Sequence, residues 1–410
     1  MSLYAADRVA VPEDFDLESA RADTPGCRSV VHLNSAGAGL TCESVVEAMI
    51  GHLRAEATIG AYEAAHAATE QLALVHDAAA TLLGCRASEI AVLDNASRAW
   101  SLAVQSIPLR RGDRVLVSGS EYMSNCVVLE AVCRRAGAEL ELLPIDVHGR
   151  VCVERLGEIV DARVRLIAVP HIPICGGHVN PVAEIGQIAQ QVGSLYVVDA
   201  CQSLGHVPVD VEAIGCDFLT AAGRKYLRGP RGTALLYARA QSMPKLSRHA
   251  LAADVYGTRW LPDGSWETRD DARRFESWET NCAARIGLGL AVEYANRRDV
   301  QATWPRVRSL GEHLRSALAE LPQVELYDAA DDGCGIVSFA VGSRRPDAIR
   351  SSLSALGINV SVAEPALTPW HPSARRFGIV LRASVHYYNT VCEIDTFVEA
   401  LAAADELAAR

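Results

Sequence analysis

Short apolar runs alternate with longer runs of mixed polarity through most of the first two thirds of the chain. Several of the short runs are almost continuous Val, Ile and Leu, which is typical of strands covered on both faces. The longer runs predict helices, and each ends near Gly or polar residues that stop a helix. This alternation predicts an α/β domain around a largely parallel sheet. The predicted strands are residues 89–95, 113–119, 139–145, 164–170, 194–200, 216–222 and 233–239, and the predicted helices include residues 98–107, 125–137 and 182–193.

The pattern changes after Trp278. Two long helices are predicted at residues 281–298 and 302–321, then strands at 335–341 and 379–385, and a closing helix at 391–410. This order predicts a smaller α+β C-terminal domain. We therefore expect three parts, which are an N-terminal segment (1–27) packed on the small domain, a large domain (28–290) and the small domain (291–410).

Composition indicates a globular protein with a large core, because half of the 410 residues are hydrophobic and 22% are charged. The net charge of -11 disfavours nucleic acid or an anionic membrane as a partner. No apolar run is long enough to span a bilayer, and the acidic N-terminal stretch lacks a secretion-signal pattern. The twelve cysteines are spread out without a CxxC pair, which favours reduced thiols in the cytoplasm. No Cys/His cluster has zinc-site spacing, so we expect no metal.

The chain has only two lysines, Lys225 and Lys245, among its 39 Lys and Arg residues. Lys225 lies in GRKYLRGPRG, and an amine, unlike a guanidinium, forms a Schiff base with an aldehyde. Asp199 ends a strongly apolar strand, where a buried acid needs a cationic partner, and Gln202 follows it. If both strand ends border one crevice, the acid and the amine supply the pair that pyridoxal phosphate requires. The alternatives are a helix-capping Asp199 and a surface Lys225.

Asn95, Ala96 and Ser97 end a strand and open a helix in LDNASRAW, which is a natural seat for a phosphate. Arg224 adds positive charge near such a phosphate. An ordinary helix N-cap is the alternative interpretation of this segment.

Arg382, in VLRASVHYYNT, lies in or at the end of a strand, where its guanidinium can bind a substrate carboxylate in bidentate fashion. A surface arginine is the alternative. Asn34 lies in the glycine-rich HLNSAGAGL, which suits close approach of the backbone to a small ligand.

With these features together, the chain resembles the class V aminotransferase-like family of fold-type I pyridoxal-phosphate enzymes, from about Val31 to Glu393. That family includes cysteine desulfurases, selenocysteine lyases, isopenicillin N epimerase-like proteins and C–S lyases. The most specific segments are DACQSLGHVPVDV, GCDFLTAAGRKYLRGPRGTALLY and RASVHYYNT.

The resemblance implies a role for each candidate residue. Lys225 would form the Schiff base and move the α-proton, Asp199 would pair with the ring nitrogen, and Gln202 would bond the ring hydroxyl. Tyr122, in SEYMSN, occupies the place of a stacked His or aromatic ring. The remaining roles are phosphate binding by Asn95, Ala96, Ser97 and Arg224, phosphate binding in the neighbouring subunit of a homodimer by Thr280, and substrate-carboxylate binding by Arg382 and Asn34.

Three departures from the family pattern bear on the reaction. Cysteine desulfurases carry a cysteine on the loop before RAS, whereas this chain has none between Cys334 and Cys392. Persulfide transfer by that route is therefore not expected. Ile174 and Cys175 stand where polar side chains are common near the ring hydroxyl, and Ala222 replaces a phosphate-binding Ser or Thr.

We expect C–S bond cleavage by β-elimination from a cysteine S-conjugate, because the missing cysteine suits direct release of a thiol. The alternatives are transamination or decarboxylation-coupled oxidative deamination of a related amino acid, and then epimerisation. A cofactor-free binding protein conflicts with the intact Asp199–Lys225 pair. A nicotinamide-dependent dehydrogenase is disfavoured, since AGAGL lacks the strand and the acid of a dinucleotide fingerprint.

Overall fold

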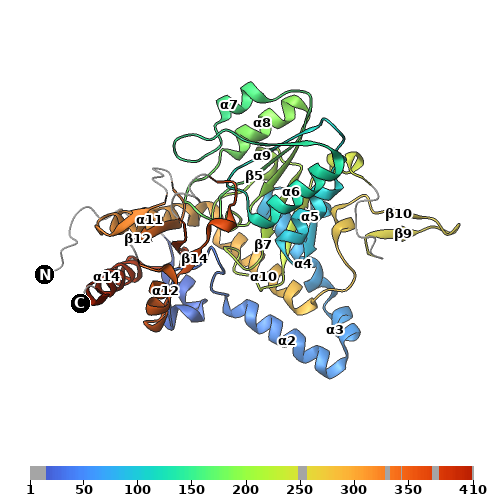
Figure 1. The fold of residues 1–410 in the computed structure, drawn as a ribbon. Helices are drawn as coiled ribbons and strands as arrows, with labels where there is room; N and C mark the ends of the chain where they lie inside the picture. Colours follow the sequence, from blue (N-terminus) through green and yellow to red (C-terminus); the bar gives the residue numbers. More distant parts are fainter. Residues whose placement is uncertain (1–14, 248–255, 328–332, 343, 372–377, 409–410) are drawn as a thin grey trace.

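A mostly parallel sheet of seven strands lies at the centre of the computed structural model, which describes residues 15–247, 256–327, 333–342, 344–371 and 378–408 (Figure 1). Every strand predicted between residues 89 and 239 belongs to this sheet. Of the seven described strands, only β8 runs opposite to the other six. The predicted α/β class is confirmed. In spatial order the strands are β2 (Ile90–Leu93), β8 (Ala234–Ala238), β7 (Phe218–Ala222), β6 (Leu195–Asp199), β5 (Val164–Pro170), β3 (Arg114–Val117) and β4 (Glu139–Leu142).

Both faces of this sheet are covered by helices. Successive side chains along a strand point to opposite faces, so Ile167 and Val198 belong to one core, with α4, α8 and α10. Ala168 and Val197 belong to a second core on the other face, with α5 and α6. Burial on both faces explains why these strands are continuous apolar runs. The helices around the sheet are α4 (Thr69–Leu83), α5 (Ala96–Ser106), α6 (Met123–Ala136), α7 (Val153–Ile159), α8 (Val182–Val192), α9 (Val211–Ile214) and α10 (Cys282–Arg298).

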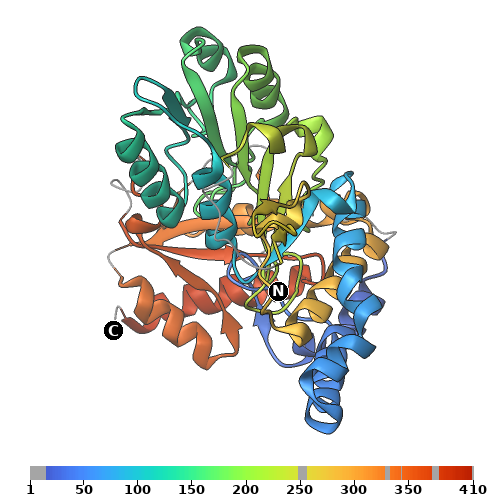
Figure 2. The same cartoon turned by 90° about the vertical axis from the view of Figure 1, so that its right-hand side faces the viewer.

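The C-terminal part forms a separate antiparallel sheet, which Figure 2 shows in orange and red beside the green strands. Helices α11 and α14 contribute to the third core, with strands β12 and β15. The order of this sheet is β11 (Val324–Leu326), β12 (Ile336–Val341), β15 (Val380–Ser384) and β14 (Ser361–Ala363). Its helices are α11 (Val300–Ala319), α12 (Pro346–Ala355) and α14 (Val391–Ala408).

Two further strand pairs and three further α-helices complete the strands and α-helices of the described residues. Strands β9 (Thr258–Trp260) and β10 (Trp266–Thr268) form a hairpin that projects from the body of the molecule (Figure 1). Strand β1 (Val31–His32) pairs in parallel with β13 (Ile358–Asn359). The remaining helices are α1 (Leu17–Ala22), α2 (Glu43–Ile59) and α3 (Ala61–Ala67). None of the described helices is long and apolar enough to cross a membrane.

The predicted domain boundaries stay a prediction. Residues 1–14 lie outside the described part of the chain, whereas Arg21 on α1 forms an ion pair of 2.8 Å with Glu393 on α14. The boundary expected at 290/291 falls inside the continuous helix α10. A change of domain therefore has to occur without a break in that helix.

Candidate active site

Lys225 and Asp199 lie at neighbouring strand ends of the central sheet. Asp199 is the last residue of β6 and is in register with Thr220 on the adjacent parallel strand β7. Lys225 follows the end of β7 in a turn. Both side chains are buried, and the carboxylate is near enough to favour the charged form of the amine. The structure thus brings the predicted pair together.

The buried amine of Lys225 has a lowered pKa and forms no ion pair with the described residues. Burial lowers its pKa below the ordinary lysine value, and the charges of Arg224 and Arg382 act in the same direction, against Cys201 and Asp199. Nζ makes no hydrogen bond and no ion pair with the residues that the structure describes. A lowered pKa enlarges the neutral fraction, and a neutral amine is the form that attacks an aldehyde.

Two hydrogen bonds fix the carboxylate of Asp199. Oδ1 accepts from the backbone N–H of Cys201 at 2.8 Å, and Oδ2 accepts from Asn125 Nδ2 at 2.9 Å. The same nitrogen of Asn125 donates its other hydrogen to Glu121 Oε1 at 2.9 Å. Burial and the nearby Asp199 charge raise the pKa of Glu121 well above its ordinary value. Glu121 therefore favours the neutral acid beside Asp199.

Two buried oxygens without partners lie on segments next to this pair, since Gln202 follows Asp199 and the loop after Asn34 bonds Arg224 through Gly39 N–H at 2.9 Å. Gln202 donates from Nε2 to the carbonyl of Ala36 at 3.1 Å, while its buried Oε1 has no hydrogen-bond partner. Asn34 Oδ1 is also buried without a partner, and Asn34 bridges to Ser384 on β15. Such atoms are costly unless a ligand pairs with them. Together with the unpartnered Lys225 amine, they fit the predicted cofactor.

Arg382 reaches the same region from β15. Its side chain is buried, donates from Nε to Ser361 Oγ at 3.1 Å and donates from Nη1 to the carbonyl of Ile174 at 2.9 Å. These bonds fix the guanidinium plane and leave Nη2 without a hydrogen bond to the described residues. Because Ile174 contributes only its backbone here, its apolar side chain does not disturb this contact. Cys175 packs in a small apolar cluster with Val380.

The predicted phosphate loop lies at the carboxyl end of β2, with β8 between it and β7. Asn95 caps α5 by accepting from Arg98 N at 2.8 Å, so Ala96 and Ser97 form the first turn of the helix. Free N–H groups in this turn suit a phosphate. Within the described residues, no hydrogen bond or ion pair joins Asn95, Ala96 or Ser97 to Lys225.

Three other predicted positions differ in how far they are buried and in which residues they contact. Thr280 is exposed and lines a cavity of about 600 Å³ with Asp94 and Arg98 of its own chain, so its reach to a neighbouring subunit stays a prediction. Tyr122 is the half-buried N-cap of α6 and donates from its N–H to Glu121 Oε1 at 2.9 Å. Ala222 is buried at the end of β7, where it offers no hydroxyl.

Sequence reasoning missed Asn125, Glu121 and Cys201. Glu121 precedes α6 and Asn125 lies in its first turn, and no periodic signal shows that Asn125 reaches Asp199. Cys201 stands between Asp199 and Gln202, and this position alone could have indicated that it belongs to the candidate site.

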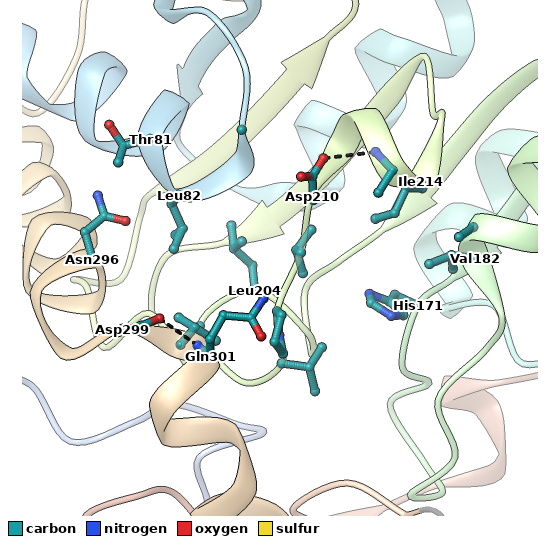
Figure 3. A pocket seen from close by; sticks show the side chains of 18 residues that line it. Thr81, Leu82, His171, Val182, Leu204, Asp210, Ile214, Asn296, Asp299 and Gln301 are labelled. Carbon is teal, nitrogen blue, oxygen red and sulfur yellow. Dashed lines mark hydrogen bonds between the residues drawn. The ribbon is translucent and has the colours of Figure 1, made fainter. Parts of the chain in front are cut away.

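His171 was also missed. Its backbone N–H donates to the carbonyl of Asp199 at 2.9 Å, and burial lowers the pKa of its ring to about 4. The ring does not join the group around Lys225. Instead it lines a separate cavity of about 460 Å³, where Figure 3 shows it near Val182 with Asp299 and Gln301 on the opposite side. None of the predicted site residues lines that cavity in the described structure.

Comparison with known proteins adds an independent line of evidence. The family model described as Aminotransferase class-V matches residues 31–397. A probable cysteine desulfurase of Methanothermobacter thermautotrophicus is 32% identical over 390 residues, which is 94% of this chain and 97% of that protein. An apo structure of a cysteine desulfurase from Thermococcus onnurineus NA1 has a TM-score of 0.86 at 25% identity, covering 96% of this chain and 98% of that one. The cystine C–S lyase C-DES, in complex with its product cysteine persulfide, has a TM-score of 0.81 at 21% identity, covering 92% and 99%, which shows a shared fold.

Proposed function

Because this chain belongs to the class-V aminotransferase family, we propose that it is a pyridoxal-phosphate enzyme that breaks the C–S bond of a cysteine S-conjugate. The family and the cofactor predicted from the sequence are confirmed by the match over residues 31–397. The bond and the substrate are the proposal. When bound, the cofactor supplies an aldehyde that attaches an amino group and a ring that accepts the electron pair released at Cα.

The observation that carries the proposal is the buried Lys225 amine, which lies close enough to Asp199 to sense its charge and has no hydrogen-bond or ion-pair partner within the described chain. Lys225 would hold the aldehyde and then take the proton from Cα. Asp199, fixed by Asn125 and Cys201, would keep the ring nitrogen protonated. Gln202 would pair with the ring hydroxyl.

The remaining candidate residues hold the phosphate, the ring face and the substrate. Arg382 takes the carboxylate through its unused Nη2, with Asn34 beside it, so that the Cα–H bond stays near Lys225. Tyr122 would pack against the ring. The residues that would hold the phosphate are Asn95, Ala96, Ser97, Arg224 and Thr280.

The proposed reaction is an α,β-elimination. Lys225 removes the α-proton, the Cβ–S bond breaks, and the sulfur leaves as a thiolate that regains a proton. Hydrolysis of the remaining three-carbon unit gives pyruvate and ammonium, so one water and one S-conjugate yield one thiol, one pyruvate and one ammonium. The absence of a cysteine between Cys334 and Cys392 supports direct release of the thiol.

We also propose that the protein is a cytoplasmic homodimer. All twelve cysteines are free thiols, which supports a reducing compartment. Apolar side chains on α2, on α3 and just before α10 are exposed, including Leu53, Tyr62 and Trp278 at 51%, 71% and 53%. The rings of Tyr62 and Trp278 lie 6.1 Å apart, and an apolar surface of this kind suits burial against a second copy.

A panel of S-substituted cysteines and free cysteine tests the reaction, with products identified by mass spectrometry. The proposal predicts thiol and pyruvate in equal amounts from an S-conjugate. Alanine with a protein persulfide from free cysteine would instead show desulfuration, the activity named for the relatives. Consumption of an added keto acid would show transamination, and loss of optical rotation without new products would show epimerisation.

A further inference from the structure

Three side chains with metal-ligating atoms meet outside the group around Lys225. His52, Glu56 and Cys282 each offer one such atom, and the three atoms lie within 4.8 Å of one another. His52 and Glu56 are four residues apart on α2 and therefore share one face of that helix. Cys282 is the first residue of α10, which packs against α2.

The imidazole of His52 is buried, at 6% exposure, and its Nε2 makes no hydrogen bond with the described residues. This nitrogen nevertheless lies 3.2 Å from Glu56 Oε1. Two ligand atoms of a tetrahedral zinc ion, each about 2.0–2.1 Å from the metal, are themselves about 3.3 Å apart. The spacing therefore fits a nitrogen and an oxygen that bind one cation between them.

Cys282 is the third member of this group. Its Sγ donates only a long hydrogen bond, of 4.0 Å, to the carbonyl of Thr280. Burial raises the pKa of this thiol, and the charge of Glu56 adds to the effect. A bound divalent cation lowers the pKa of the thiol instead, because coordination stabilises the thiolate.

We propose that His52, Glu56 and Cys282 form a zinc site with an open fourth position. Imidazole, carboxylate and thiolate are all zinc ligands, and three protein ligands with one open position are typical of sites that bind a water or a small ligand. Glu56 and Cys282 line the cavity of about 600 Å³ that also contains Thr280, so a small molecule has access to the ion. A thiol is the ligand class that suits this ion best.

The sequence predicts no metal because no Cys/His cluster in it has zinc-site spacing. That criterion does not detect this group, because Cys282 lies far from His52 in the sequence. The site adjoins one of the residues assigned to the cofactor phosphate, because Glu56 and Cys282 line the same cavity as Thr280. Its three ligands are not among the residues assigned to the cofactor or the substrate.

The test uses the full-length protein with its cofactor, stripped of metal by a chelator and titrated with Zn²⁺ alone. We expect one zinc per chain by elemental analysis. X-ray absorption should show one sulfur at about 2.3 Å and nitrogen or oxygen at about 2.0–2.1 Å. Cys282→Ser, which preserves side-chain size, should lower zinc affinity at least about 100-fold, since losing even a supporting partner of a ligand costs 10–100-fold. Cys392→Ser, at an exposed cysteine on α14, should leave the affinity unchanged.

Glu56→Gln provides a second variant on a half-buried side chain, and it should also weaken zinc binding. Thermal unfolding of each metal-free variant shows whether it folds like the unaltered protein. Failure to bind zinc stoichiometrically, a metal shell without sulfur, or an affinity that Cys282→Ser leaves unchanged would each overturn the proposal.

Discussion

Asn125 Nδ2 donates a hydrogen bond of 2.9 Å to Asp199 Oδ2. The donor is a neutral amide that also bonds Glu121, so the acid assigned to the cofactor ring is tied to a second buried acid through a group that does not titrate. This arrangement fixes the direction of the Asp199 carboxylate. It also explains why Glu121 lies unexposed at this position.

Asn125→Ala removes that bond and should weaken cofactor binding. A hydrogen bond to a charged group contributes about 1.5–3 kcal/mol, so we expect the cofactor Kd to rise roughly 10- to 100-fold. Titration of the stripped protein with pyridoxal phosphate, followed by absorbance, measures the change. Ser124→Ala, one residue away on α6, is the control. Equal affinity in the two variants would mean that Asn125 does not hold Asp199 for the cofactor.

Lys225→Ala should abolish turnover, because it removes the amine that holds the aldehyde and moves the α-proton. Any cofactor that remains bound should have the spectrum of a free aldehyde. The matched control is Lys245→Ala, which removes the other lysine of the chain, an exposed one. A covalently held cofactor in the Lys225→Ala protein would contradict the assignment.

Arg382→Ala should raise KM more than it lowers kcat. The lost interaction is a charge-assisted bond to the substrate carboxylate, which binds the ground state and the transition state alike, and about 10- to 100-fold in KM is expected. Steady-state kinetics with one S-conjugate provide both constants. Arg350→Ala, on α12, serves as a control for loss of one positive charge. An unchanged KM for Arg382→Ala would remove this residue from the carboxylate site.

The sequence predicted those parts of the fold and site that local pattern determines. Strand β5 was predicted with its observed bounds, since a two-sided apolar strand has a distinct composition. Asp199 and Lys225 were proposed from the sequence because Asp199 ends such a strand, Lys225 follows another, and each is an unusual side chain for its place. Asn125 was not found, because its contact with Asp199 depends on how far α6 packs across the sheet. His52 and Cys282 were missed for the same reason, as helix packing alone brings them together.

Protonation of buried histidines should make the protein less stable in mild acid. Burial lowers the pKa of His171 to about 4 from an ordinary value of 6.5. Between these pH values the unfolded chain takes up a proton that the folded chain excludes, so the free energy of unfolding falls as the pH decreases. The contribution of His171 is about 2 kcal/mol at pH 5. Urea unfolding at pH 7.5 and pH 5 measures how much the free energy of unfolding falls between the two pH values. This decrease should be smaller in His171→Gln than in the unaltered protein, whereas in the exposed His66→Gln it should equal that of the unaltered protein. A difference identical to that of the unaltered protein would contradict the pKa shift.

The position of Thr280 tests whether each active site is built from both subunits of the proposed dimer. If Thr280 binds the phosphate of the neighbouring subunit, a mixed dimer of one Thr280→Val chain and one Lys225→Ala chain has one complete site, because the first chain keeps its amine and receives Thr280 from the second. If Thr280 acts within its own chain, where it shares a cavity with Asp94 and Arg98, neither site of that mixed dimer is complete. Two different affinity tags allow the mixed dimer to be purified. We expect the mixed dimer to have about half of the activity of the unaltered dimer, and either variant homodimer to have much less. If the mixed dimer is no more active than the Thr280→Val homodimer, Thr280 acts in the site of its own chain.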